Sequence, residues 1–261
     1  MKKTSYIIIS LLSVGLLLAG VWGWFFHIGL KDAPSYVATL SPQSITKTVP
    51  AFKHLVIHQE FPKEVTASFM TFKDFKSIDF KIKHSSNQVN SLTLPADIME
   101  ASSFRVQADT LFVDLHFKGN PFKNWNFKSR LHYADKYDIK SPEWYLSVSG
   151  PLLSVNYQGR TDLYIEGLSQ DSLSIYSRRD IHLTQTHVGS LRFRGEQPIN
   201  VHLYNTKLDK VYPEAQLIEF LPDSLSQIND YYYIGYKDSK NINLDIKYPC
   251  TIHWIPDNKN K

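Results

Sequence analysis

The chain has 261 residues, of which 43% are hydrophobic, 13% aromatic and 21% charged, and its formal net charge is +4. This composition excludes intrinsic disorder as the default state, and the length allows one sizeable β-domain or two small ones. The 15 Tyr and 15 Phe residues favour strands over helices. Charges are spread along the chain and no nucleic-acid motif occurs, so no nucleic-acid partner is predicted. Cys250 is the only cysteine, which excludes an internal disulfide.

The first thirty residues are an apolar segment behind two lysines. Residues 6–26 read YIIISLLSVGLLLAGVWGWFF, and a helix rising ~1.5 Å per residue over this length crosses a bilayer. Lys2 and Lys3 favour an orientation with the bulk of the chain outside. We therefore predict a single-pass anchor at residues 1–30 in a bacterial inner membrane, with the remainder in the periplasm. A cleaved signal peptide, followed by secretion, is the alternative.

The rest of the chain divides into a tether and one domain. Residues 31–50 contain three prolines and several small polar residues, which predict a tether. Residues 51–261 are predicted to form one β-domain, with a short helical turn within residues 94–102. An aromatic-rich stretch near residues 118–145 is predicted to be an insertion that caps an open end of the sheet or presents a surface to a partner.

Short apolar alternations recur with a regular spacing. Two columns recur at a constant spacing of 18: Leu163, Ile181 and Ile199, and Ile165, Leu183 and Val201. Leu146 and Val148 extend both columns upstream at a spacing of 17. A second strand of each repeat is marked by Leu173 and Leu191, then by Val211 after a spacing of 20. Such a period fits one coil of a β-solenoid, whose coils stack like positions ~4.8 Å apart. We predict an all-β fold, a short β-solenoid, with an antiparallel β-sandwich as the alternative.

The order of these segments also matches a family pattern. A tether is followed by strands such as AFKHLVIHQ and IDFKIKHSSNQVNSLTL, then by SSFRVQADTLFVDL, and then by stacked Leu/Ile/Val repeats. Over roughly residues 45–215 this order resembles the auto-transporter adhesin family with the head GIN domain, exported proteins of Gram-negative bacteria. The resemblance implies a right-handed β-helix and a role in adhesion, and it supplies no catalytic residues.

Outward-pointing positions of the repeats combine cations with aromatic rings. The predicted rows are Ser174, Arg192 and Lys210 beside Tyr176, Arg194 and Tyr212. Such a face holds an acidic glycan through charge and ring contacts. The predicted ligand-binding residues are therefore Arg192, Arg194, Lys210, Tyr176 and Tyr212. A solvated face on which arginines pack over tyrosines is the alternative.

The sequence offers little catalytic chemistry. No hydrolase, phosphate-loop or dinucleotide motif occurs, so neither catalytic residues nor a cofactor are predicted. Asp162 and Asp180 occupy equivalent places, with Pro198 as the expected third member, and are interpreted as corner residues. His54 and His58 lie ~13 Å apart if they share a strand, which is too far to chelate one metal ion. Three further histidines, at 182, 187 and 202, are interpreted as scattered surface residues.

These observations favour a membrane-anchored, envelope-facing protein that is not an enzyme. Its predicted partner is a glycan or another envelope protein. The alternative is a structural scaffold of an envelope complex, and a glycan-modifying enzyme ranks third.

Overall fold

The computed structural model describes residues 12–24, 35–61, 78–121, 136–195, 199–213, 218–235 and 250–256. The chain divides into two compact units, one of residues 1–38 with 124–138 and the other of residues 39–123 with 139–261. All five residues predicted to bind a ligand belong to the larger unit.

The smaller unit contains a helix over residues 12–24 and most of a two-stranded sheet. That sheet pairs β1 (Ser35–Thr39) with β8 (Lys136–Lys140). In the described part of the chain, no helix combines the length and the apolar character needed to cross a membrane. Both ends of the predicted 6–26 segment lie outside the described residues, so the membrane anchor stays a prediction.

The larger unit is built mostly of strands. In chain order they are β2 (Ser44–Val49), β3 (His54–Glu60), β4 (Phe80–His84), β5 (Asn90–Pro95), β6 (Ser103–Gln107), β7 (Thr110–His116), β9 (Trp144–Val148), β10 (Ser154–Gln158), β11 (Leu163–Glu166), β12 (Ser169–Ser177), β13 (Ile181–Thr184), β14 (His187–Gly195), β15 (Ile199–Tyr204), β16 (Lys207–Pro213), β17 (Ile218–Pro222), β18 (Gln227–Gly235) and β19 (Thr251–Pro256). The helix α3 (Ala96–Ala101) confirms the helical turn predicted within residues 94–102, and it buries Ile98 and Met99. The predicted all-β class is confirmed.

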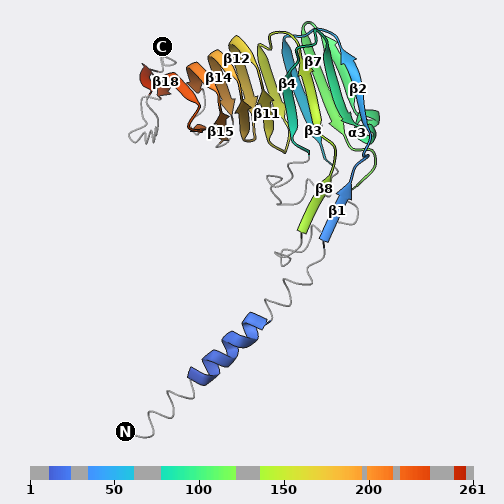
Figure 1. The fold of residues 1–261 in the computed structure, drawn as a ribbon, viewed down its shortest axis with the longest axis vertical. Coiled ribbons are helices and arrows are strands. Elements are labelled where there is room, and N and C mark those ends of the chain that lie inside the picture. The colour runs from blue at the N-terminus through green and yellow to red at the C-terminus, as the bar shows by residue number, and fades with distance from the viewer. Residues whose placement is uncertain are drawn as a thin grey trace. The chain divides into compact units, whose positions relative to one another are not determined.

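These strands form two sheets that pack face to face (Figure 1). The nine-stranded sheet has the order β19-β18-β16-β14-β12-β10-β3-β7-β6, and the eight-stranded sheet has the order β17-β15-β13-β11-β4-β9-β5-β2. From β10 to β18, successive strands of the chain alternate between the two sheets. Each strand from β10 to β16 pairs in parallel with the strand two places further along the chain.

The core consists of apolar columns that face inward from both sheets. On the nine-stranded sheet the predicted column of Leu173, Leu191 and Val211 is confirmed, since these residues are in register and buried. On the eight-stranded sheet the buried columns in register are Leu163, Ile181 and Val201, and Ile165, Leu183 and Leu203.

The predicted third member of each column on the eight-stranded sheet was therefore wrong. Ile181 pairs with Val201 and not with Ile199, so the spacing at this step is 20 and not 18. The step on the nine-stranded sheet between Leu191 and Val211 has the same spacing. The two extra residues fall between Gly195, which still pairs at a spacing of 18, and Val201. This place lies within both steps, so both are lengthened together.

The upstream extension of the columns was wrong as well. β11 pairs with β4, and β4 in turn pairs with β9. Leu163 therefore stacks on Phe80 and then Trp144, and the predicted neighbour Leu146 falls in the column of Ile165. A strand from much earlier in the chain occupies the place that the repeat spacing assigned to β9.

Antiparallel pairing is found among the first strands of the larger unit. The described antiparallel pairs of this unit are β2 with β5, β5 with β9, and β6 with β7. The first pair corrects the predicted tether, because residues 44–49 pair with β5 along their whole length. The three prolines of the predicted tether lie outside β2, so every amide of this strand keeps its N–H.

Most of the predicted aromatic insertion, residues 122–135, lies outside the described residues. Its C-terminal end belongs to the core and not to an insertion. Trp144 is fully buried on β9, its ring lies 5.9 Å from that of Phe117, and its Nε1 donates a hydrogen bond to Ser141 Oγ at 2.7 Å.

Candidate binding face

The five predicted ligand-binding residues lie on three neighbouring strands of the nine-stranded sheet. We call this set the basic face: Tyr176 on β12, Arg192 and Arg194 on β14, and Lys210 and Tyr212 on β16. They alternate with buried residues along each strand, so they point to the outer side of the sheet. The three cations are exposed and the two tyrosines are half-buried.

The register within the basic face differs from the predicted one. Arg192 pairs with Tyr212, and its guanidinium carbon lies 5.6 Å from the centre of the Tyr212 ring. Lys210, predicted to follow Arg192 in one row, pairs instead with Ser190. Arg194 is in register with Tyr176. The longer step accounts for this change, because it moves β16 by two residues relative to a repeat with a constant spacing of 18.

The row that begins at Arg192 continues beyond the residues predicted from the sequence, onto β18 and β19. The Tyr212 ring stacks on Tyr232 of β18 with centres 4.6 Å apart and planes inclined by 14°. Tyr232 in turn stacks on His253 of β19 at 4.5 Å and 13°. His253 Nε2 lies 2.9 Å from Asp230 Oδ1. The regular spacing of the two tyrosines was visible in the sequence, but the predicted repeat ended at Val211.

A second stack lies on the outer side of the eight-stranded sheet. The Tyr164 ring lies 4.2 Å from His182, and His182 lies 4.5 Å from His202, with each pair nearly parallel. Tyr204 runs parallel beside both histidines, at 6.2 and 6.4 Å. His182 and His202 therefore belong to an ordered stack, and their interpretation as scattered surface residues was wrong. Burial, followed by the nearby charges of Asp79 and Asp162, raises the pKa of Tyr164.

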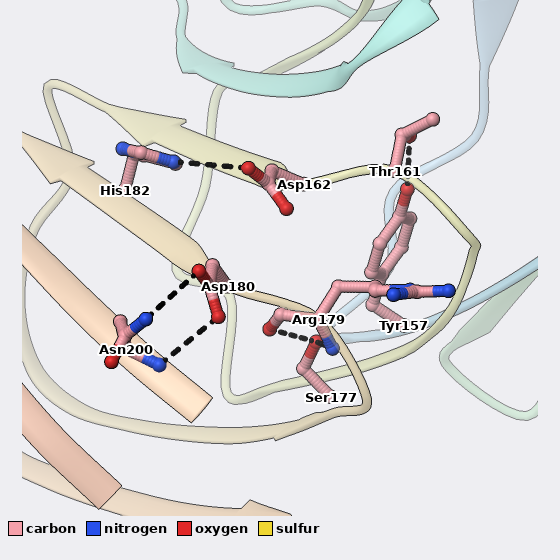
Figure 2. Close-up of polar contacts among 8 residues, drawn as sticks. All are labelled: Tyr157, Thr161, Asp162, Ser177, Arg179, Asp180, His182 and Asn200. Atoms are coloured by element: carbon pink, nitrogen blue, oxygen red, sulfur yellow. Dashed lines mark hydrogen bonds and ion pairs between the residues drawn. The ribbon is translucent and has the colours of Figure 1, made fainter. Parts of the chain in front are cut away.

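The carboxylates beside this stack have separate partners (Figure 2). Asp162 Oδ2 lies 3.5 Å from His182 Nε2, and only 13% of the Asp162 side chain is exposed. Asp180 accepts hydrogen bonds from the backbone N–H and from Nδ2 of Asn200, both at 3.1 Å. The third member of this row is therefore Asn200 and not Pro198. Each of these hydrogen bonds joins a carboxylate to the next strand, which indicates a structural role.

A buried tyrosine fills the corner between β10 and β11. Tyr157 is fully buried, and its hydroxyl lies 2.9 Å from Thr161 Oγ1 (Figure 2). A Cβ at Gly159 would lie 2.2 Å from the Tyr157 ring, so this position requires glycine. Burial raises the pKa of the Tyr157 hydroxyl. This hydroxyl donates or accepts the hydrogen bond with Thr161 inside the corner.

Metal-binding side chains do not converge in the described residues. No three His, Cys, Asp or Glu side chains among them are placed to hold a metal ion. His54 and His58 lie on one strand, as predicted, and His54 Nδ1 lies 2.7 Å from Ser154 Oγ.

Fold and face together define the class: an all-β protein of two facing sheets with an exposed basic surface. No family model matches the chain, and no curated protein matches it. The resemblance to the auto-transporter adhesin family therefore stays a prediction.

Several solved structures are similar to the chain at low identity. A "putative adhesin" from Parabacteroides distasonis is 11% identical, with a TM-score of 0.47 over 85% of this chain and 78% of that one. A "putative adhesin" from Parabacteroides merdae is 13% identical, with a TM-score of 0.36 over 85% and 95% of the two chains. A "putative lipid binding protein" from Parabacteroides distasonis is 9% identical, with a TM-score of 0.37 over 77% and 81%. At these values the similarity assigns neither a family nor a ligand.

Proposed function

We propose that the larger unit is a right-handed β-solenoid that binds an acidic glycan on the basic face and catalyses no reaction. The alternation of β10 to β18 between two sheets, with parallel pairing at each step, supports the solenoid. In the full proposal, residues 6–26 anchor the protein in the inner membrane and the solenoid meets envelope polysaccharide in the periplasm.

The observation that carries the proposal is the grouping of exposed cations on adjacent strands. Arg192 and Arg194 are two residues apart on β14, so both guanidiniums project from the same side of the sheet. Lys210 projects from the neighbouring strand β16. A guanidinium binds a carboxylate or sulfate through paired hydrogen bonds, and the cation–π contact with Tyr212 holds Arg192 in place. Such a surface favours uronic or sulfated sugars over neutral ones.

A glycan array tests this function. The full-length chain in detergent micelles is compared with an Arg192→Gln/Arg194→Gln variant on acidic and neutral polysaccharides. We expect binding to acidic glycans only, lost in the variant and weakened by salt. An Arg105→Gln/Lys118→Gln variant, which removes the same charge from β6 and from the segment after β7, is the matched control and should bind normally.

Two outcomes contradict the proposal. Equal binding by the parent and the Arg192→Gln/Arg194→Gln variant would show that the basic face is plain surface. Failure of the folded parent to bind any acidic glycan would favour the alternative of a structural scaffold within an envelope complex.

A further inference from the structure

We propose that the glycan lies across the strands of the nine-stranded sheet, along the direction in which they stack, with one sugar unit on each strand. This inference rests on the proposed function. It extends the site from the basic face to the end of the sheet, and it fixes the orientation and the length of the ligand.

A continuous row of side chains defines this path. One residue from each of five neighbouring strands contributes, and we call the set the axial row: Ser174, Arg192, Tyr212, Tyr232 and His253. From Arg192 onward every member contacts the next, through one cation–π contact and two stacked ring pairs. The row crosses β12, β14, β16, β18 and β19, which are consecutive strands of the sheet. It is therefore a continuous track with one group on each successive strand.

The spacing of this track decides between classes of linear polymer. Neighbouring strands lie ~4.8 Å apart, and a pyranose unit in an extended glycan has about the same length. Side chains on one side of an extended peptide repeat every ~6.6 Å, which accumulates a mismatch of about 7 Å over four steps. Nucleotides along one strand of a DNA duplex repeat every ~3.4 Å, which accumulates about 6 Å in the other direction. A glycan therefore stays in step with the axial row, and a peptide or a nucleic acid does not.

The orientation of the rings decides which groups are recognised. Tyr212 and Tyr232 stack on each other, so the faces that meet are closed to a ligand. Their outward edges and hydroxyl groups are what the row presents. Ring edges carry partial positive charge and hydroxyl groups donate hydrogen bonds, so both suit carboxylates and sugar hydroxyl groups. A sugar therefore cannot stack on the ring faces that Tyr212 and Tyr232 turn toward each other.

Charge varies along the row. The cations of the basic face lie on β14 and β16, where they favour acidic sugar units. On β18, Asp230 lies beside the row and contacts His253, so an acidic unit there would meet a carboxylate. We therefore expect acidic units to bind most tightly over β14 and β16, and each unit over β18 or β19 to add a smaller gain, mainly through its hydroxyl groups.

A series of oligosaccharides of increasing length tests the orientation. Oligomannuronates of one to eight units are titrated calorimetrically into the full-length protein in micelles. We expect affinity to rise about tenfold from two units to five and then to level off, because each added unit reaches another rung until the row ends. A Tyr232→Phe/His253→Gln variant should lower the affinity for five units to about that for three and leave two units unaffected. Arg192→Gln should weaken binding at every length.

A gain-of-function variant keeps the test independent of folding losses. Ser174→Arg adds a cation at the β12 rung of the axial row, and it should increase the affinity for five units several-fold. If five units bind no tighter than two, while Arg192→Gln still weakens binding, the axial orientation is overturned and the proposed function stands. If no oligomannuronate of any length binds, the axial orientation is overturned, and the glycan array decides separately whether the proposed function stands.

Discussion

The β10–β18 part and the β2–β9 part of the larger unit differ in which strands are paired with one another. From β10 to β18, neighbouring strands of a sheet come from successive repeats of the chain, and all of these pairs are parallel. Between β2 and β9 most neighbours are far apart in the chain, as when β3 lies between β7 and β10, and the exception is the hairpin of β6 and β7. There, too, antiparallel pairs mix with parallel ones.

This difference determines which part of the unit is stabilised by contacts between segments that are close in the sequence. In the β10–β18 part each repeat contacts the one before and the one after, so its stability is close to a sum of neighbour terms. In the β2–β9 part, β4 pairs with β11 through a register that joins residue 80 to residue 163. The strands of the β2–β9 part pair only when distant segments have come together. The entropy lost in closing these long loops therefore opposes their pairing.

The largest expected effect comes from a matched pair of core deletions. Trp144→Ala in the β2–β9 part and Phe193→Ala in the β10–β18 part each remove a fully buried ring, and each should lower the free energy of unfolding by about 3–5 kcal/mol. Hydrogen exchange should separate them. Phe193→Ala is expected to speed exchange mainly in β12–β16, and Trp144→Ala in β4, β5 and β11 as well. Identical exchange patterns would show that the two parts open as one.

The next effect concerns close approach between repeats. A Cβ at Gly189 would lie 2.8 Å from the backbone oxygen of Asp171, one repeat earlier. Gly189→Ala should therefore lower the free energy of unfolding by about 1–3 kcal/mol, because neither backbone can move without breaking the ladder. Gly150→Ala is the matched control, since nothing lies within 4 Å of its added Cβ. Chemical denaturation of both variants measures the difference, and equal midpoints would contradict the close packing.

A smaller effect tests the register of the longer step itself. Asn200→Ala removes the amide that donates to Asp180 across the strand gap, and it should lower the free energy of unfolding by about 1–2 kcal/mol. The control is Asn156→Ala, whose amide oxygen accepts a hydrogen bond in an exposed contact with Gln158. It should change stability by less than about 0.5 kcal/mol. No loss in Asn200→Ala would favour the alignment with a constant spacing of 18.

The smallest effect is electrostatic and lies in the β2–β9 part. Hydrogen bonds from Lys81 and Lys83 lower the pKa of Glu143 to about 2. Because this folded-state pKa lies below the unfolded one, the stabilisation is complete above about pH 4.5 and is lost as the pH falls toward 2. The Glu143 side chain is 55% exposed, so we expect no more than about 1 kcal/mol. Parent and Glu143→Gln should differ at pH 7 and converge as the pH approaches 2, and a constant difference would contradict the assignment.

The sequence predicted the β10–β18 part better than the β2–β9 part for a physical reason. Where neighbours follow one another along the chain, their alternation and spacing are visible, and the column of Leu173, Leu191 and Val211 came out correctly. A pair such as Phe80 with Leu163 leaves no periodic trace, so β4 could not be placed.

For the candidate site, the sequence predicted which side of the sheet the residues face but not how they pair between strands. All five predicted residues lie together, because alternation along a strand fixes which side of a sheet a residue faces. Their mutual pairing was wrong for Lys210, since a constant spacing of 18 does not register an insertion of two residues. Tyr232 and His253 were missed because the predicted repeat ended at Val211, although both continue the row at spacings of 20 and 21 residues.

The stacked tyrosines have an optical consequence. With Tyr212 and Tyr232 at 4.6 Å, the electronic transitions of the two phenol rings couple. We expect this coupling to add a near-ultraviolet circular dichroism signal that depends on the relative orientation of the rings. The axial row then carries its own probe: a ligand that tilts either ring changes the spectrum, and no dye or label needs to be attached to the protein.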